Sequence, residues 1–266
     1  MSPRVRLGIL GWPVAHSRSP AMQNAALRAA GLVDWRYQLL PVPPELLAET
    51  VRALPLAGFH GANVTIPHKE AALRLADDAS ERAQGIGAAN TLRFDAGTVH
   101  ADNTDAPALI EALPFSPAAR TALVLGAGGS ARAAVWALLD AGASEVRVWN
   151  RTRERAHRLC AGLGGIPVST AESADVLINC TASGLDDPES TFAQLPLEAD
   201  DLWRFECVVD FVYGAGETPL VRAARARSIM VVDGLELLVG QGALSFERFT
   251  ARRAPIDVMR TAVRAP

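Results

Sequence analysis

The sequence is short of several features that mark particular classes of protein. It has three cysteines, Cys160, Cys180 and Cys207, which have neither metal-ligand spacing nor the even number of a disulfide framework. Its longest apolar run is shorter than the roughly 18 residues of a membrane-spanning helix, and its first residues lack a signal-peptide pattern. These absences predict a cytoplasmic protein with reduced thiols, no metal site and no membrane partner.

The sequence also lacks a strong excess of either charge. The formal net charge is −3 and the pI is near 6.0, so nucleic acid is not expected as a partner. The 266 residues fit about two domains. With 49% hydrophobic and 21% charged residues, the chain has ample material for packed cores.

The first part of the chain alternates strand and helix patterns. Short apolar runs predict strands, Ser19-Pro20 and Pro67 open predicted helices, and an Asp95-Ala96-Gly97 turn joins two strands in a small hairpin. This order predicts a mostly parallel open sheet covered by helices. The predicted strands are 5–10, 35–42, 58–64, 90–94 and 98–101.

Pro114 to Pro117 break this pattern and mark the predicted domain boundary. A second α/β unit follows, and residues 183–206 are predicted to form a long surface loop with one helical turn. The fold class is therefore α/β with two domains, the second of the Rossmann type. The predicted strands of the second unit are 121–125, 145–150, 176–179, 207–211 and 229–233, and a final helix is predicted over 235–249.

A glycine-rich turn lies directly between a predicted strand and a predicted helix. Gly126, Gly128 and Ala131 have the spacing of a dinucleotide-binding turn, in which the pyrophosphate approaches the backbone at the start of a helix. A helix N-terminus that merely needs flexible residues is the alternative. The predicted contacts of this turn are Gly126, Ala127, Gly128, Gly129, Ser130 and Ala131.

The end of the next strand indicates which dinucleotide is bound. An NAD site places Asp or Glu there, whereas this chain has Asn150-Arg151-Thr152-Arg153, with Arg155 beyond. A carboxylate would repel a 2′-phosphate, and guanidinium groups attract it and bond to it in bidentate fashion. NADP is therefore the predicted cofactor. The alternative is that these arginines belong to a solvated helix start.

Two polar stretches each hold one residue that can move a proton. Lys69 follows Asn63-Val64-Thr65-Ile66-Pro67-His68 at the start of a helix, where the helix dipole disfavours the ammonium form. Asp105 ends the stretch Asp102-Asn103-Thr104-Asp105. A surface lysine and a helix N-cap are the alternatives for these two residues taken singly. Together with the nicotinamide site they predict a carbonyl reductase.

The order of these motifs resembles that of the shikimate dehydrogenase family. The resemblance includes the opening motif Gly-x-Pro-x-x-His-Ser-x-Ser-Pro, found here from Gly11 to Pro20, and extends over nearly the whole chain. The further motifs are Asn63–Lys69, Ala89–Thr91, Asn103–Asp105, the glycine turn, Asn150–Thr152, Asn179–Thr181 with Gly184, Asp210–Tyr213, and Asp233–Leu235 with Gln241.

The resemblance implies a reversible, NADPH-dependent reduction of 3-dehydroshikimate to shikimate, a step towards aromatic amino acids. It also implies that Lys69 and Asp105 form the catalytic pair and that Thr181, Gly234 and Leu237 contact the cofactor. The implied substrate-binding residues are Ser17, Ser19, Thr65, Lys69, Asn90, Asp105, Tyr213 and Gln241. The implied domains are 1–113 plus 235–266 for the substrate and 118–234 for NADP, in a monomer or homodimer.

Some positions depart from the family pattern. Ala101, Ala106 and Ala108 stand where the family usually has Gly, and an alanine at a backbone of positive φ would be strained and would shift Asp105. These departures leave open a related quinate or aminoshikimate dehydrogenase. A dinucleotide-sensing protein without catalysis is the alternative from another class, and the presence of Lys69 and Asp105 disfavours it.

Overall fold

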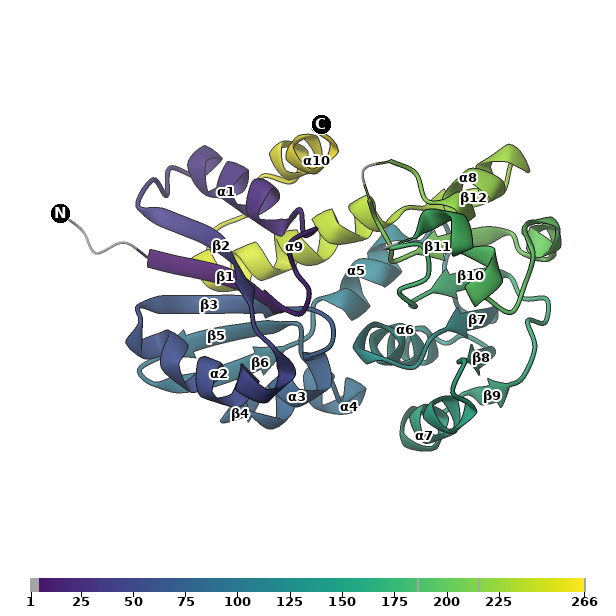
Figure 1. The fold of residues 1–266 in the computed structure, drawn as a ribbon, viewed down its shortest axis with the longest axis horizontal. Coiled ribbons are helices and arrows are strands. Elements are labelled where there is room, and N and C mark those ends of the chain that lie inside the picture. Colours follow the sequence, from purple (N-terminus) through teal and green to yellow (C-terminus); the bar gives the residue numbers. More distant parts are fainter. Residues whose placement is uncertain (1–4, 186, 215, 266) are drawn as a thin grey trace. The chain divides into compact units, whose positions relative to one another are not determined.

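The computed structural model describes residues 5–185, 187–214 and 216–265, and it divides into two compact units (Figure 1). The first unit comprises Met1–Asp105 and Leu238–Pro266, and the second comprises Ala106–Leu237. The chain passes between them inside two helices, α5 (Asp105–Ala112) and α9 (Gly234–Thr250). The described residues include no helix with the length and hydropathy needed to cross a membrane.

The first unit is built on a six-stranded sheet with the order β2-β1-β3-β5-β6-β4. β1 pairs in parallel with β2 and β3, whereas β5 pairs antiparallel with β3 and β6. The predicted hairpin is confirmed, since Ala96 and Gly97 between β5 and β6 both have positive φ, as a tight two-residue turn requires. The strands are β1 (Val5–Gly11), β2 (Trp35–Pro41), β3 (Phe59–Val64), β4 (Asp78–Ala79), β5 (Thr91–Asp95) and β6 (Thr98–Asp102).

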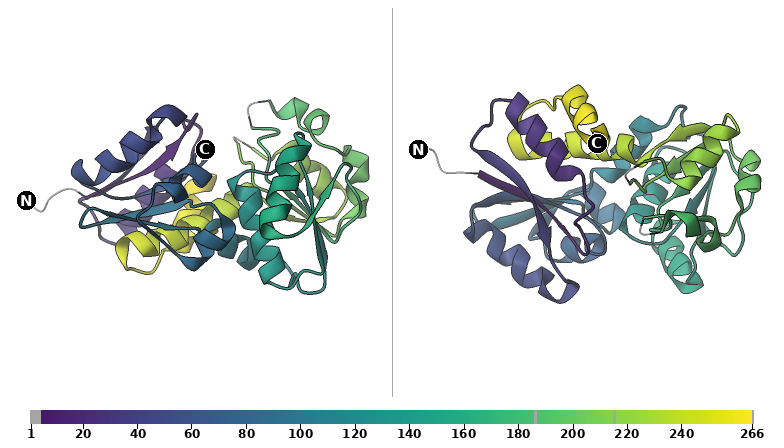
Figure 2. Two further views of the ribbon diagram at one scale, coloured as in Figure 1. Left: turned by 90° about the horizontal axis from the view of Figure 1, so that it is seen from below. Right: turned by 45° about the horizontal axis from the view of Figure 1, so that its top comes forward.

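Helices cover both faces of this sheet. In Figures 1 and 2, α2 lies on one face and α9 crosses the other. α9 approaches closely because Gly61 has no side chain: a Cβ there would lie 2.5 Å from Cε1 of Phe249. The helical elements of this unit, besides α9, are α1 (Ser19–Ala29), η1 (Pro44–Leu46), α2 (Leu47–Leu56), α3 (Lys69–Arg74), α4 (Glu81–Ile86) and α10 (Ile256–Arg264).

The second unit has a six-stranded, fully parallel sheet with the order β12-β11-β10-β7-β8-β9. The strand order reverses between β7 and β10, and ligands of such sheets bind at the carboxyl ends of the strands beside this point. The strands are β7 (Thr121–Leu125), β8 (Glu145–Trp149), β9 (Ile166–Val168), β10 (Val176–Asn179), β11 (Cys207–Asp210) and β12 (Met230–Val232).

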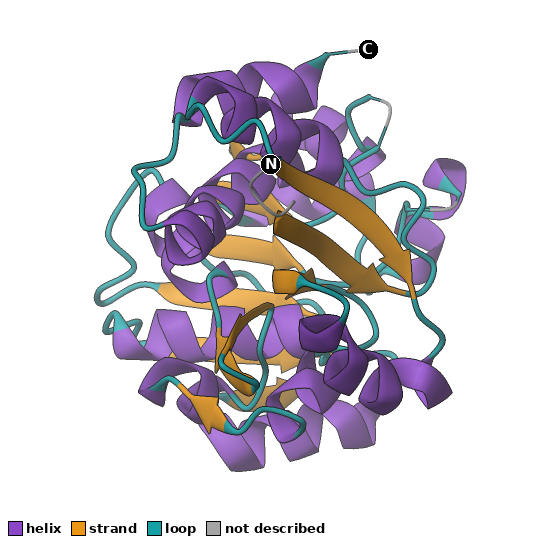
Figure 3. Ribbon diagram, turned by 90° about the vertical axis from the view of Figure 1, so that its left-hand side faces the viewer, coloured by secondary structure: helices purple, strands orange, loops and turns teal. Residues whose placement is uncertain are grey.

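Alternation along the strands divides the core of this unit between the two faces of the sheet. Ala122 and Val124 of β7 pack with α6 (Gly129–Asp140) and α7 (Arg153–Leu163) on one face. Leu123 and Leu125 pack on the other, where α8 (Pro219–Ala226) lies. Helices therefore cover both faces of this sheet. In Figure 3, helices likewise lie on either side of the strands of the first unit. The predicted α/β fold class is confirmed.

The structure differs from the sequence predictions in three places. The N-cap of α1 is Arg18, not Ser19. The segment 183–206 is not simply a surface loop, because Leu195, Leu197, Leu202 and Phe205 cover one sheet face. Its short 3-10 helices are η2 (Pro188–Ser190), η3 (Phe192–Gln194) and η4 (Ala199–Arg204).

The third difference concerns where the units meet along the chain. They change at Asp105–Ala106 and at Leu237–Leu238, rather than around Pro114–Pro117 and residue 235. The reason is packing, since Leu109 and Leu113 after the first point and Leu237 before the second are buried in the core of the second unit. The assignment of substrate and cofactor to the two units stays a prediction.

Candidate active site

Lys69 and Asp105 meet in the first unit. Lys69 is the first residue of α3 and Asp105 is the first residue of α5. The lysine Nζ donates to Oδ2 of Asp105 at 2.5 Å, and the two side chains are 10% and 7% exposed. A buried ion pair is costly to desolvate and contributes little to stability by itself. The observed contact therefore fits the predicted pair of proton-transferring groups better than a surface lysine and a simple helix cap.

The lysine content of the chain adds a second argument. Lys69 is the only lysine in the sequence, and every other residue in the combined count of Lys and Arg is an arginine. Arginine stays protonated in proteins, whereas a lysine amine can give up its proton. The single lysine amine of this arginine-rich chain therefore stands at position 69. This signal can be read from the sequence alone.

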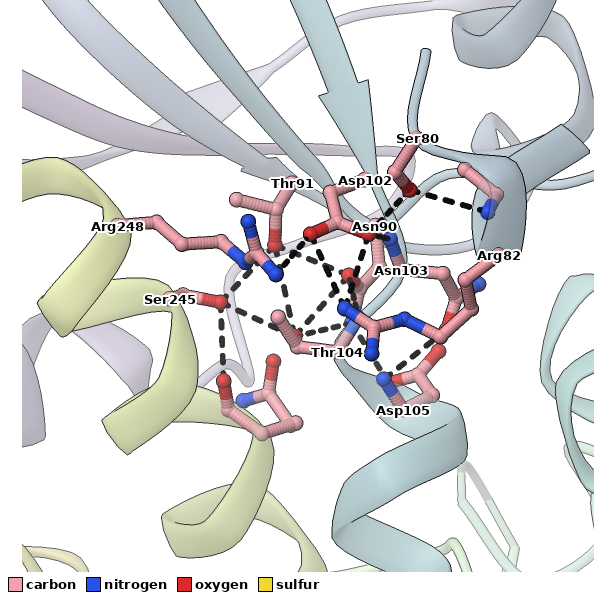
Figure 4. Close-up of polar contacts among 12 residues, drawn as sticks. Ser80, Arg82, Asn90, Thr91, Asp102, Asn103, Thr104, Asp105, Ser245 and Arg248 are labelled. Carbon is pink, nitrogen blue, oxygen red and sulfur yellow. Dashed lines mark hydrogen bonds and ion pairs between the residues drawn. The ribbon is translucent and has the colours of Figure 1, made fainter. Parts of the chain in front are cut away.

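Asp105 is held by two asparagine side chains. Nδ2 of Asn90 donates to Oδ1 of Asp105 at 2.8 Å, and the backbone N–H of Asp105 donates to Oδ1 of Asn103 at 3.0 Å. The other N–H of the Asn90 amide is placed to reach Oγ1 of Thr104 at 3.0 Å (Figure 4). Both carboxylate oxygens of Asp105 therefore have a donor, Lys69 on one and Asn90 on the other.

A chain of hydroxyl and amide groups lies behind Asn90. Oγ of Ser245, on α9, lies 2.9 Å from Oγ1 of Thr91 and 3.1 Å from Oγ1 of Thr104 (Figure 4). The same Oγ lies 2.8 Å from Nδ2 of Asn63. Asn63 accepts a further bond from the hydroxyl of Tyr37 at 2.8 Å. Asn63 is thus a buried residue of this network.

The other predicted substrate-binding residues come from separate elements: Ser17 lies in the loop after β1, Ser19 begins α1, Thr65 follows β3, Gln241 lies on α9, and Tyr213 belongs to the second unit. Oγ of Ser17 accepts from the backbone N–H of Ser19 at 3.3 Å. The methyl group of Thr65 packs against Gly11, where a Cβ would lie 2.5 Å away. Nε2 of Gln241 donates to the carbonyl of Leu238 at 2.9 Å. Their substrate contacts stay a prediction.

The three alanines around Asp105 are not strained. Among the described residues other than glycine, positive φ occurs at Ala96, Ala119, Ser228 and Ala251. Ala101 lies in β6, and Ala106 and Ala108 lie in α5, where alanine adopts the backbone without cost. The replacement of glycine therefore does not displace Asp105 through backbone strain.

The glycine turn of the second unit has the geometry that a dinucleotide needs. Gly126 has φ +114°, and a Cβ there would lie 3.0 Å from the carbonyl oxygen of Cys180. Gly128 is extended and stands before α6, and a Cβ on it would point into open space. The first turn of α6 holds no acidic residue and Gly128 provides no side-chain cap. A pyrophosphate could therefore approach these backbone N–H groups.

The arginines at the end of β8 are available for an anion. Arg151, Arg153 and Arg155 are exposed, and none has an ion-pair or hydrogen-bond partner for its guanidinium group among the described residues. Asn150 fixes the turn before α7, since its Nδ2 donates to the carbonyl of Thr152 at 2.9 Å. The strand end therefore presents unpaired positive charge, as the prediction of a 2′-phosphate site requires.

The remaining predicted cofactor residues differ in their surroundings. Thr181 Oγ1 donates to Oδ1 of Asn179 at 2.7 Å. At Gly234 a Cβ would lie 2.4 Å from the carbonyl oxygen of Val212, so a side chain is excluded. Leu237 is buried in the apolar core, which is the environment of a packing residue rather than of an exposed cofactor contact.

A buried carboxylate that the sequence analysis did not single out lies beside Tyr213. Asp210 ends β11, and burial raises its pKa to about 6, although bonds from Thr218, Val212 and Asn179 favour the charged form. Thr218 Oγ1 donates to Oδ2 at 2.6 Å, while Nδ2 of Asn179 and the N–H of Val212 donate to Oδ1. Asp210 therefore ties the loop that leads to Tyr213 to β10 and α8.

Protein-family comparisons match most of the chain to one family. Residues 9–92 match a model of the shikimate dehydrogenase substrate binding domain, and residues 111–185 match one of shikimate / quinate 5-dehydrogenase. Residues 234–264 match a model of the shikimate 5′-dehydrogenase C-terminal domain. Within the described residues, no group of His, Cys, Asp and Glu side chains is arranged to hold a metal ion.

Individual relatives agree with the family models. The chain is 45% identical to shikimate dehydrogenase (NADP(+)) of Paracoccus denitrificans, over 94% of this chain and 92% of that protein. The crystal structure of shikimate 5-dehydrogenase from Thermus thermophilus in complex with NADP(H) and shikimate is 41% identical, with a TM-score of 0.86 over 98% of both chains. A 5-ketofructose reductase of Gluconobacter sp. is 31% identical, with a TM-score of 0.85 over 99% of both chains.

Proposed function

Because the chain belongs to the shikimate dehydrogenase family, we propose that it catalyses the reversible, NADPH-dependent reduction of 3-dehydroshikimate to shikimate. The observation that carries this proposal is the buried contact between Lys69 and Asp105. It gives the site a proton donor beside a fixed carboxylate. The relatives named shikimate dehydrogenase (NADP(+)) support the same substrate and cofactor.

The reaction adds a hydride to the C3 carbonyl carbon and a proton to its oxygen. When bound, NADPH supplies the hydride. Lys69 gives the proton to the carbonyl oxygen and stabilises the negative charge that gathers there. Asp105 keeps the amine of Lys69 in place, and Asn90 holds the second oxygen of Asp105, so the carboxylate does not turn away. The pair takes up a proton from solvent before the next turnover.

The predicted substrate-binding residues give the proposal its substrate class. Ser17, Ser19, Thr65, Gln241 and the hydroxyl of Tyr213 offer hydrogen bonds suited to a carboxylate and ring hydroxyls. The amide of Asn90 already serves Asp105 and Thr104. We therefore assign to Asn90 the main role of holding Asp105, and a direct contact with the substrate as a secondary role.

The residues present fit NADP. The turn from Gly126 to Ala131 takes the pyrophosphate at the start of α6, and Arg151 and Arg155 take the 2′-phosphate beside Asn150 and Thr152. Thr181 and Gly234 lie near the carboxyl ends of β10 and β12, the edge of the sheet at which ligands of this fold bind. No acidic side chain ends β8, which disfavours NAD.

The decisive experiment is oxidation of NADPH by the purified protein with 3-dehydroshikimate. We expect fast turnover with this pair and turnover at least about a hundredfold slower with NADH, because the arginines contact only a 2′-phosphate. The parallel ketones are 3-dehydroquinate, an amino analogue of 3-dehydroshikimate that keeps the C3 carbonyl, and 5-ketofructose, the last prompted by the similarity to the reductase. Faster turnover with one of them would reassign the substrate, and no turnover with any would favour a dinucleotide sensor.

The proposal extends to a cytoplasmic protein that acts as a monomer or homodimer. Cys160, Cys180 and Cys207 are free and buried, which suits a reducing compartment. The pair of Lys69 and Asp105 lies within one chain, so this contact forms without a residue from a second copy. Light scattering at assay concentration, compared with the mass of one chain, distinguishes the two states.

A further inference from the structure

The carboxylate of Asp102 is the most heavily bonded acidic group near Asp105, and the proposed reaction gives it no role. Asp102 ends β6, and its side chain is 8% exposed. Nη2 of Arg82 lies 3.1 Å from both of its oxygens, and Arg248 forms a second ion pair with Oδ2. Ser80 Oγ and the N–H of Asn103 donate to Oδ1 at 2.6 and 2.7 Å.

This cluster joins three elements that are distant in sequence. Arg82 comes from the first turn of α4, Arg248 comes from the last turn of α9, and the two guanidinium groups reach Asp102 from different sides (Figure 4). On α9, Arg248 follows Ser245 by three residues and Gln241 by seven, so these residues share one face of the helix. The face that carries a predicted substrate ligand is thereby anchored to the end of β6.

Asp102 reaches Asp105 through both of the asparagines that hold it. The side chain of Asp102 fixes the N–H of Asn103, whose Oδ1 accepts from the N–H of Asp105. The backbone carbonyl of Asp102 accepts from the N–H of Asn90 at 3.0 Å, and Asn90 donates to Oδ1 of Asp105. Loss of the Asp102 side-chain bonds would therefore loosen Asn103, and an accompanying shift of the Asp102 backbone would move Asn90.

The composition of the cluster is not that of a site selected for stability alone. Two guanidinium groups converge on a single buried carboxylate, which leaves a net positive charge. Nε of Arg82 is buried and has no hydrogen-bond partner among the described residues. An unsatisfied buried N–H lowers stability, so its presence calls for a role other than packing.

We propose that Asp102, clamped by Arg82 and Arg248, is a positioning residue that fixes the direction of the Asp105 carboxylate towards Lys69. This inference rests on the proposed function for its effect on turnover. It predicts that loosening the clamp lowers kcat and leaves the binding of substrate and NADP nearly unchanged, because the reacting groups lose alignment rather than ligands.

The test compares Asp102→Asn, Arg248→Met and Arg248→Lys with the control Arg93→Met. Arg93 forms an ion pair with Asp95 at 3.1 Å on the same sheet, but this pair is largely exposed. We expect kcat per NADP-binding site to fall about a hundredfold in Asp102→Asn and about tenfold in Arg248→Met, with KM and the Kd for NADP within about twofold. Arg248→Lys should keep most of the kcat that Arg248→Met loses, and the control Arg93→Met should have the kcat of the unsubstituted protein.

A second readout does not depend on turnover. Because Lys69 is the only lysine, an amine-acetylating reagent marks it unambiguously, and the α-amino group serves as internal standard. The rate of Lys69 acetylation in the folded protein, followed by mass spectrometry, should rise about tenfold in Asp102→Asn and in Arg248→Met as the ion pair loosens. Arg248→Met is the safer variant, since Arg248 is 45% exposed and its removal leaves Arg82 on Asp102.

These measurements separate failure of the inference from failure of the proposed function. If the unsubstituted protein reduces none of the ketones, the function is wrong, and the acetylation rates still decide whether the clamp positions Asp105. Equal rates of Lys69 acetylation in the unsubstituted protein, Asp102→Asn and Arg248→Met would overturn the positioning role. So would a loss of turnover that lies wholly in KM, or one that the Arg93→Met control shares.

Discussion

The two units present their candidate functional groups in different ways. In the first, Asp105 is surrounded by side chains that bond to it and to one another, from Asn90 and Asn103 to Ser245 on α9. In the second, the predicted cofactor groups are mainly backbone at Gly126–Gly129 and exposed guanidinium groups without partners among the described residues. Side-chain hydrogen bonds therefore fix the direction of the reacting groups in the first unit, whereas the second unit offers positive charge and space for a ligand beside its backbone.

The largest effect should come from removing the amine of Lys69 in the first unit. Lys69→Ala and Lys69→Arg should each lower kcat by about three orders of magnitude, because neither side chain can give a proton to the carbonyl oxygen. The arginine variant keeps the positive charge beside Asp105. Rapid kinetics of NADPH oxidation and the Kd for NADP, measured on both variants, check this. Wild-type turnover in Lys69→Arg would show that charge alone suffices.

The next effect concerns the side-chain network around Asp210 in the second unit. Its folded pKa of about 6 exceeds the ordinary value of 3.8, so between these values the folded state keeps a proton that the unfolded chain has lost. The stability that Asp210 contributes is therefore present at low pH and is lost as pH rises through about 6. From about pH 4 to about pH 7 the loss is on the order of 3 kcal/mol.

Denaturant unfolding of the protein and of Asp210→Asn across this range isolates that contribution. The free energy of unfolding of the unsubstituted protein, minus that of the variant, should decrease as pH rises, because the variant has no group that titrates at this position. A difference that is constant with pH would mean that Asp210 stays charged in the folded state.

The third prediction tests whether the exposed arginines act as independent charges. Replacing Arg151, Arg153 and Arg155 together by Gln should raise the KM for NADPH about 30-fold and leave the KM for NADH unchanged, because only NADPH carries the 2′-phosphate. Arg158→Gln, on the exposed side of α7, is the matched control. An equal rise for both cofactors would place the 2′-phosphate elsewhere.

The smallest effect concerns two glycines of the glycine turn. One is expected to leave space for the pyrophosphate, and the other to allow a backbone conformation of positive φ. Gly128→Ala should weaken NADP binding about tenfold at unchanged stability, since its backbone suits alanine and the new methyl group enters open space. Gly126→Ala should instead destabilise the fold by about 1–3 kcal/mol, because of its positive φ and the nearby Cys180 carbonyl. Thermal unfolding together with NADP titration distinguishes the two, and identical behaviour of both variants would refute this division of roles.

Local patterns predict much of this fold. The hairpin at Asp95–Gly97 and the turn at Gly126 follow from backbone conformations that only some residues adopt, and the structure has both. Strands of the second sheet are recognisable because their apolar residues are continuous and bounded by turns. The N-terminus of α1 was misplaced by one residue, since Arg18 occupies the cap without any side-chain bond that the sequence could signal.

The support of Asp105 could not be predicted in the same way. Thr104 and Ser245 lie 141 positions apart and meet only because α9 packs on the sheet of the first unit. Asp102 stands inside a motif that the sequence does mark, yet its partners Arg82 and Arg248 are ordinary surface residues by pattern. Local rules identify the reacting groups, and long-range packing decides what holds them.

The return of the chain to the first unit after Leu237 has a consequence for biosynthesis. The second unit, Ala106–Leu237, is continuous in sequence and has its whole core available once those residues have left the ribosome. The first unit lacks Ser245, Arg248 and the helix that covers one sheet face until translation reaches the final residues. Folding on the ribosome should therefore finish in the reverse of the usual order, with the unit that starts first completed last.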